Sequence, residues 1–134
     1  MATIGGNLAN AAPSAEMAPA LIVLSAKVKL VSPGGERLVP LEDFFTGPGS
    51  TILRADELLT EIQVPPPPAH SGGVYLKFSK RGGEDLALVG VAALITRGEG
   101  DGICLDAKLA LGAVAPIPIR APRAEEMLKG QKVD

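Results

Sequence analysis

Apolar and polar residues alternate in several short segments of the chain, as they do in strands that bury one face. In the first half this pattern predicts strands over residues 27–31 and 59–64. The turn sequence Pro33-Gly34-Gly35-Glu36 follows the first of these and predicts a second strand over 37–41, so we expect residues 27–41 to form a hairpin. A segment of helix-compatible composition, residues 16–25, precedes them.

The second half continues with four segments in order: a strand over 74–79, an apolar run over 86–96, a strand over 103–114 and a helix over 123–129. The apolar run could be a long strand or a buried helix, because periodicity alone does not separate the two. Pro122 stands at the start of the final helix and Gly130 closes it. The spacing suggests an antiparallel meander followed by a helix.

A run of four prolines at residues 65–68 is the clearest break in the chain. Consecutive prolines cannot continue a helix or a central strand, and they favour an extended conformation. We therefore divide the chain into residues 1–65, a linker over 66–73 and residues 74–134. The fold class that this order of elements predicts is α+β.

The composition of the chain argues against several classes of function. The formal net charge is −2 and no long block of Lys or Arg occurs, which argues against nucleic-acid binding. The single cysteine, Cys104, is interpreted as a core thiol and the single histidine, His70, as a loop residue, so no metal site is expected. The pair Asp56-Glu57 is interpreted as first-turn charge that complements a helix dipole. The apolar stretch at residues 18–26 is too short to cross a bilayer, and we expect a soluble cytoplasmic protein.

A glycine pair near the start of the chain is the first candidate for binding chemistry. Paired glycines let backbone N–H groups approach an anion because no Cβ is in the way, and a following helix start adds unpaired donors. The sequence Thr3-Ile4-Gly5-Gly6-Asn7 fits a phosphate-contacting turn of this kind. An ordinary structural turn is the commoner explanation of a bare Gly-Gly pair, so the pair alone does not decide.

The longer string over residues 2–16 closely resembles the second flavin-binding motif of the medium subunit of molybdenum hydroxylases, the xanthine dehydrogenase and aerobic carbon monoxide dehydrogenase family. Other segments that resemble the family follow in its order: Phe44-Phe45-Thr46-Gly47, residues 58–65, Lys77, Lys80-Arg81, Asp85 and residues 109–120. The resemblance covers essentially the whole chain.

The resemblance implies the second lobe of a two-lobed FAD-binding domain, followed by a partial C-terminal lobe with an antiparallel three-stranded sheet and a helix. It implies an oxidoreductase, as the FAD subunit of a molybdopterin-dependent dehydrogenase. In such a complex FAD accepts electrons from two-iron two-sulfur clusters on a small subunit, a large subunit holds molybdopterin, and NAD is a candidate acceptor. The flavoprotein itself binds, orients and tunes the flavin.

The resemblance also assigns the pyrophosphate contacts. Thr3, Gly6 and Asn7 would contact the FAD pyrophosphate through hydroxyl, backbone N–H and side-chain amide, and Ile4 and Gly5 complete the loop. These five residues form the first part of the implied cofactor site.

Four further positions complete the implied site. Glu16 stands where the family usually has Asp, a carboxylate suited to ribose hydroxyls, and Leu59 would lie near the adenine or the flavin edge. Lys77 would lie near the flavin ring, where a cation stabilises negative charge on the reduced ring, although a solvated strand lysine is the alternative. Asp85 lies near the flavin or caps a turn. No residue is assigned a catalytic or metal-binding role.

One departure from the family pattern leaves the function open. The family's first phosphate loop, an Ala-Gly-Gly-Thr-Asp-Leu type of sequence, does not occur in this chain, and both ends of the sequence look cut. The alternative function is therefore a truncated, non-catalytic scaffold or assembly fragment that does not bind flavin alone. We expect the isolated chain to be inactive and to bind FAD weakly or not at all. A third interpretation is an unrelated small binding domain with a chance Gly-Gly-Asn.

Overall fold

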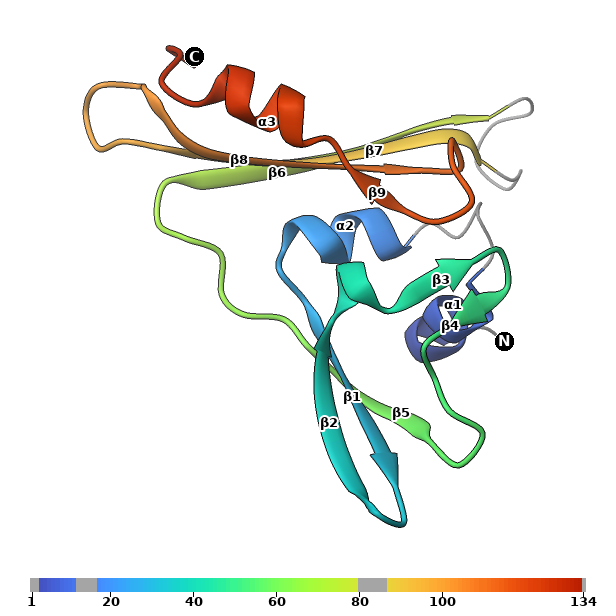
Figure 1. The fold of residues 1–134 in the computed structure, drawn as a ribbon. Coiled ribbons are helices and arrows are strands. Elements are labelled where there is room, and N and C mark those ends of the chain that lie inside the picture. The colour runs from blue at the N-terminus through green and yellow to red at the C-terminus, as the bar shows by residue number, and fades with distance from the viewer. Residues whose placement is uncertain (1–2, 12–16, 80–86, 134) are drawn as a thin grey trace.

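The computed structural model describes residues 3–11, 17–79 and 87–133, and it arranges them mainly around two antiparallel sheets (Figure 1). The first sheet has the order β2-β1-β5, with the strands β1 (Lys27–Ser32), β2 (Gly35–Pro40) and β5 (Leu58–Gln63). The predicted hairpin is confirmed: β1 pairs with β2 in a register that places Val28 opposite Val39. Only Pro33 and Gly34 remain outside the strands at its turn.

Short elements surround the first sheet: α1 (Ile4–Asn10), α2 (Met17–Val23), the 3-10 helix η1 (Leu41–Asp43), β3 (Phe45–Gly47) and β4 (Ser50–Thr51). Their apolar side chains enter the same core as those of β1. Leu8, Leu41 and Phe44 are fully buried. Because aromatic residues make up only 3% of the chain, aliphatic side chains form most of this core.

The second sheet has the order β6-β7-β8-β9, with β6 (Ser71–Ser79), β7 (Ala87–Arg97), β8 (Cys104–Gly112) and β9 (Ile119–Arg120). The predicted meander is confirmed, and the apolar run over residues 86–96, whose conformation periodicity left open, belongs to a strand. The three long strands are those expected, and β9 adds a two-residue strand at one edge. The helix α3 (Pro122–Leu128) follows and packs against β8. The predicted α+β fold class is confirmed.

The helix α2 lies between the two sheets in Figure 1 and contacts β7, β8 and η1. It is buried on most of its surface, through Ala18, Pro19, Leu21, Ile22 and Val23. The sequence pattern extended this helix to residue 25, but Ser25 has a φ of 61° and ends it. The N–H of Ala26 donates to the carbonyl of Leu21 at 3.0 Å and that of Ser25 to Ile22 at 3.0 Å, which is the Schellman pattern of helix ends.

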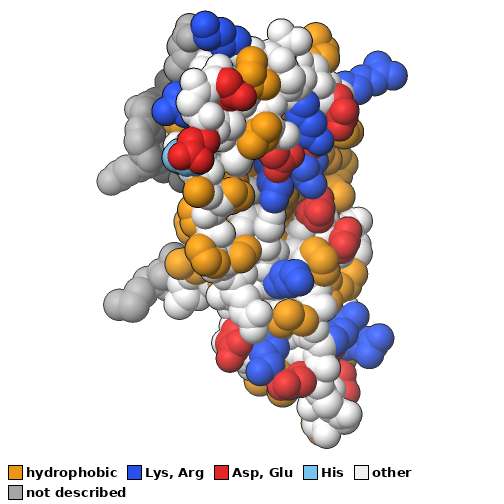
Figure 2. All heavy atoms as spheres, turned by 90° about the vertical axis from the view of Figure 1, so that its left-hand side faces the viewer, with side chains coloured by type: hydrophobic (Ala, Val, Ile, Leu, Met, Phe, Trp, Pro, Cys, Tyr) orange, Lys and Arg blue, Asp and Glu red, His pale blue; other side chains and the backbone are white. Residues whose placement is uncertain are grey.

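Charged side chains of both signs lie on the surface of the molecule. On the face that Figure 2 shows, basic and acidic side chains are interspersed with hydrophobic ones. In the part of the chain that the structure describes, no helix is long and apolar enough to cross a membrane.

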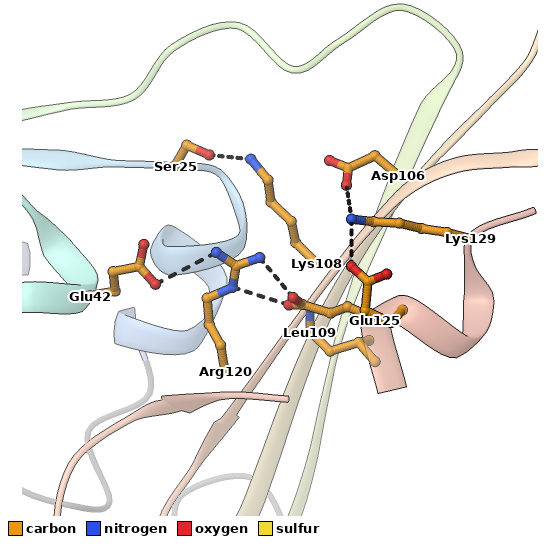
Figure 3. Close-up of polar contacts among 9 residues, drawn as sticks. Ser25, Glu42, Asp106, Lys108, Leu109, Arg120, Glu125 and Lys129 are labelled. Carbon is orange, nitrogen blue, oxygen red and sulfur yellow. Dashed lines mark hydrogen bonds and ion pairs between the residues drawn. The ribbon is translucent and has the colours of Figure 1, made fainter. Parts of the chain in front are cut away.

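Arg120 joins the two halves of the molecule (Figure 3). Its Nε and Nη2 atoms donate to both carboxylate oxygens of Glu125, at 3.0 and 2.8 Å, and its Nη1 lies 3.6 Å from a carboxylate oxygen of Glu42, next to the first sheet. Glu125 is 5% exposed and also accepts the N–H of Leu109 at 2.8 Å. Lys108 of β8 donates to the Ser25 hydroxyl and adds a second contact between the halves.

Glu57 forms a second buried ion pair, and the interpretation of Asp56-Glu57 as helix-dipole charge is wrong. Glu57 is 6% exposed and precedes a strand rather than a helix. Both carboxylate oxygens accept hydrogen bonds from Arg37 of β2 at 2.8 Å, and one also accepts the N–H of Arg54 at 2.8 Å. The Arg37 hydrogen bonds, followed by that from Arg54, lower the pKa of Glu57 from 4.5 to about 2.

We predict that Glu57→Gln destabilises the fold in a pH-dependent way. Because the pKa of Glu57 is lowered in the fold, its ionisation contributes stability that is fully present above about pH 4.5 and disappears as the pH falls toward 2. Urea unfolding should therefore show a lower midpoint for the variant at neutral pH, and the difference from the parent chain should shrink as the pH falls through this range.

Asp56→Asn is the matched control, because Asp56 is adjacent and exposed. It should leave the midpoint close to that of the parent chain. A pH-independent difference between Glu57→Gln and the parent chain would contradict the ionic role of Glu57.

Candidate functional site

The glycine pair lies inside a helix rather than in a turn before one. Gly5 and Gly6 belong to the first turn of α1, and Thr3 is its N-cap. The Thr3 hydroxyl accepts the N–H of Gly6 at 2.9 Å, and its carbonyl accepts the N–H of Asn7 at 2.9 Å. Helical hydrogen bonding therefore begins at Thr3, and the interpretation of the pair as a separate turn is wrong.

The first turn of α1 leaves backbone donors at its open end. Because the N–H groups at the start of a helix have no carbonyl one turn earlier, those of Ile4 and Gly5 lack an intrahelical partner. Gly6 is exposed and Gly5 is half-buried. The end of α1 thus presents N–H groups near the surface, together with the hydroxyl of Thr3.

The space around the two glycines differs. A Cβ at Gly6 would lie 2.9 Å from the Thr3 hydroxyl oxygen, so a side chain there disturbs the cap. A Cβ at Gly5 would lie 3.8 Å from Cδ2 of Leu59, an ordinary van der Waals distance. The absence of a side chain at residue 6 is therefore what keeps the Thr3 cap in place.

Asn7 carries the clearest sign of a missing partner. Its Oδ1 atom is buried and has no hydrogen-bond partner among the described residues. A buried polar atom without a partner is costly, so such an atom in a native fold calls for an explanation. A half rotation of the amide exchanges Oδ1 and Nδ2, so the same position can present either an acceptor or a donor. This position fits a polar ligand group such as a phosphate oxygen.

Two apolar residues hold α1 in place. Leu8, on the helix, is fully buried in the core, and Leu59 of β5 packs beside Gly5. The structure therefore brings Thr3, Gly5 and Leu59 together from segments far apart in the sequence. The anchoring of α1 by Leu8 was not predicted from the sequence. Its position four residues after Ile4 is the apolar spacing of a helix and could have indicated this role.

Lys77 lies in the other sheet. It is half-buried in β6, and the register places it in one row across the sheet with Gly90 of β7 and Gly112 of β8. A Cβ at Gly112 would lie 2.8 Å from Cγ of Pro19, so this row faces the start of α2. In Figure 1 this end of the second sheet and α1 lie on the same side of the molecule, the right-hand side.

Gly90 and Gly112 were also missed. A Cβ at Gly90 would lie 2.5 Å from the Tyr75 hydroxyl oxygen, so this glycine makes room for a ring on the neighbouring strand. A glycine inside a strand pattern commonly marks such a close approach, which is the signal that could have identified both.

The remaining sequence-based assignments have mixed outcomes. Glu16 and Asp85 lie outside the described residues, so their assignments stay predictions. Cys104 is confirmed as a core thiol, at 2% exposed, and its Sγ donates to the carbonyl of Asp106. His70 is confirmed as a loop residue before β6. The described residues include no group of three or more side chains suited to binding a metal ion.

Comparisons with known proteins identify both halves of the chain. Residues 1–67 match the model of the FAD binding domain in molybdopterin dehydrogenase, and residues 74–134 match that of the CO dehydrogenase flavoprotein C-terminal domain. The chain is 39% identical over 127 residues to the xanthine dehydrogenase FAD-binding subunit of Escherichia coli O157:H7, a match that covers 94% of this chain and 43% of the relative. It is 36% identical to the carbon monoxide dehydrogenase medium chain of Afipia carboxidovorans, over 100% of this chain and 46% of the relative.

Solved structures show the same fold. The Cu,Mo-CO dehydrogenase in its cyanide-inactivated form matches with a TM-score of 0.91 and 36% identity, over 100% of this chain and 46% of that chain. Quinoline 2-oxidoreductase from Pseudomonas putida 86 matches with a TM-score of 0.85 and 37% identity, over 98% of this chain and 45% of that chain. The chain thus spans less than half the length of the relatives it matches. It belongs to the family of FAD-binding medium subunits of molybdopterin-dependent dehydrogenases, as the resemblance of its motifs indicated.

Proposed function

We propose that this chain supplies the second half of an FAD site in the electron-transfer subunit of a molybdenum-dependent hydroxylase. The observation that carries the proposal is the unpartnered, buried Oδ1 of Asn7 beside the capped start of α1, within residues that match an FAD-binding model. Bound FAD would take electrons from two-iron two-sulfur clusters of a small subunit and pass them to an acceptor such as NAD, while a large subunit holds molybdopterin. We propose a cytoplasmic location for this complex.

The residues of α1 would bind the pyrophosphate by donating hydrogen bonds. The Thr3 oxygen accepts the Gly6 N–H, which leaves its own hydroxyl hydrogen free to point at a phosphate oxygen. The N–H groups of Ile4 and Gly5 would donate beside it, and that of Gly6 would be shared with the Thr3 cap. Asn7 would add its side-chain amide.

Residues outside α1 would complete the contacts. Leu59 would pack against the adenine or the flavin edge, and Glu16 would accept hydrogen bonds from ribose hydroxyls. Lys77 would place its cation near the flavin ring, where it favours the reduced, negatively charged state. Asp85 would lie close to the same ring.

A second candidate is a scaffold that binds no flavin by itself. The chain contains no Ala-Gly-Gly-Thr-Asp-Leu type of loop, and it spans less than half the length of its relatives. Each charge-assisted hydrogen bond that a partial site lacks costs roughly 1.5–3 kcal/mol of binding free energy. In this case the role of the chain is assembly.

Calorimetric titration with FAD separates the two candidates. We expect the 134 residues alone to bind FAD weakly, and binding to tighten when a segment that carries the first phosphate loop is supplied as a separate chain. Sub-micromolar affinity for the chain alone would exclude the scaffold. Failure to bind FAD even with the added segment would exclude the flavin site.

The role of Asn7 is tested by Asn7→Asp in the two-segment titration. A carboxylate at this buried position repels the pyrophosphate and removes an amide donor, so FAD affinity should fall by about tenfold or more, as for the loss of one charge-assisted hydrogen bond. Asn10→Asp is the matched control, because Asn10 is exposed on the same helix. Equal losses for the two variants would show that general charge, rather than the position of Asn7, is responsible.

The geometry of the α1 start predicts that Gly5→Ala stabilises the fold more than Gly6→Ala does. Gly5→Ala should stabilise the fold by up to about 0.5–1 kcal/mol, the usual helical gain of Ala over Gly, because within the described residues its Cβ meets Leu59 at an ordinary distance. Gly6→Ala should displace the Thr3 hydroxyl and lose a cap contribution of about 0.5–2 kcal/mol, which offsets that gain. Urea unfolding of both variants measures the difference, and a Gly6→Ala variant as stable as Gly5→Ala would contradict the role of the cap.

A further inference from the structure

A cavity of about 550 Å³ opens at the end of the second sheet that lies away from Lys77. Among the described residues, its lining includes the charged side chains of Arg97, Asp101 and Lys132 and the imidazole of His70. Ser71 pairs with Thr96 at this end and Lys77 pairs with Gly90 toward the other, so Ser71 and Lys77 are about 20 Å apart by strand rise. Figure 2 views the molecule from this end, where basic side chains stand beside acidic ones over the upper half. The cavity is therefore separate from the proposed flavin site.

Backbone hydrogen bonds fix the positions of His70, Arg97 and Lys132, although these residues come from three segments. The N–H of Arg97 donates to the carbonyl of His70 at 3.1 Å, which ties the end of β7 to the loop before β6. Lys132 forms a β-bridge with Ile103, and the N–H of Val133 donates to the carbonyl of Gly102 at 2.7 Å. The positions of the cations are thus set by the main chain and not by their own side-chain contacts.

The charges at this cavity are not balanced within the described residues. The side chains of His70, Arg97 and Lys132 are exposed and make no hydrogen bond or ion pair with the part of the chain that the structure describes. Asp101 is the acidic residue of the lining, and its Oδ1 already accepts the N–H of Ile103 at 3.0 Å. Arg37 and Arg120, by contrast, are each paired with a buried carboxylate. Two permanent cations and an imidazole therefore face one carboxylate that is partly engaged.

We propose that this cavity binds an oxyanion of the phosphate class, either free phosphate or the phosphate group of a small phosphomonoester. The planar guanidinium of Arg97 can donate two parallel hydrogen bonds to phosphate oxygens, and the ammonium of Lys132 adds a compact charge from another side. The imidazole of His70 supplies a third donor when it points its N–H at the anion. The site is independent of the proposed flavin function.

Nuclear magnetic resonance of the His70 ring tests the proposal directly. Since the chain has one histidine, its ring signals report this cavity alone. Titration with inorganic phosphate, at constant ionic strength set by chloride, should shift these signals in a saturable way. A parallel titration with glycerol phosphate distinguishes the sources, because tighter binding of the ester favours a phosphorylated small molecule and equal or weaker binding favours free phosphate.

Variants of the lining give effects of opposite sign. Arg97→Ala and Lys132→Ala should each weaken phosphate binding by about tenfold, the usual effect of one lost charge-assisted contact. Asp101→Asn keeps the oxygen that accepts the Ile103 N–H but removes the negative charge, so it should tighten binding. Arg54→Ala removes an exposed arginine outside the cavity and should leave phosphate binding unchanged.

Three results would overturn the proposal. These are a non-saturable shift that chloride reproduces, an equal loss in Arg54→Ala and Arg97→Ala, and a weaker affinity in Asp101→Asn. Because two separate cationic positions are tested, misfolding of one variant leaves the other as the test.

Discussion

The fold depends on the burial of α2 between two sheets that share one hydrophobic core. Leu21 and Ile22 of this helix belong to the same cluster of buried residues as Val28 of the first sheet and Ala110 of the second. Removal of apolar surface from water is the main favourable term in folding. A small sheet by itself buries little apolar surface and is only marginally stable. The second sheet gains a covered face from this seven-residue helix, which contacts β7 and β8, while α1 packs against β5 of the first sheet. The Schellman end at Ser25 then turns the chain directly into β1.

Two buried carboxylates hold segments at the edge of this core. Each accepts hydrogen bonds from one arginine side chain and from one backbone N–H. Glu57 accepts hydrogen bonds from Arg37 and from the backbone N–H of Arg54, while Glu125 accepts them from Arg120 and from the N–H of Leu109. Burial of a carboxylate is costly unless its oxygens are paired, so loss of either arginine would leave an uncompensated charge. In each half a loop or helix is thereby held against a strand. Arg120 also reaches Glu42, so one of the two clusters spans the halves.

The sequence predicts elements better than it predicts contacts, for physical reasons. Alternation of apolar and polar residues identifies a strand because a side chain must face either the core or water, and the first four residues of β1 follow that rule. The same rule cannot classify residues 86–96, because a strand covered on most of its surface loses its alternation. Glu57 and Arg37 are 20 residues apart, and no local pattern reports that their side chains meet. At the candidate site, the motif predicts Thr3, Gly6 and Asn7, whereas the helical state of Gly5 and Gly6 becomes visible only with the cap.

Gly112, which has no side chain, sets the spacing between the second sheet and the helices beside the candidate flavin site. Lys77, Gly90 and Gly112 stand in one row across the second sheet, and Pro19 at the start of α2 approaches Gly112 so closely that a Cβ there would lie 2.8 Å from its ring. The spacing between this end of the sheet and α2 therefore depends on residue 112 having no side chain. Because α1 also packs against α2, a larger residue at 112 would move Lys77 relative to α1 without touching either. The residues proposed to bind FAD lie on α1, on β5 and on the second sheet, and the close approach of Pro19 to Gly112 sets the spacing between α2 and that sheet.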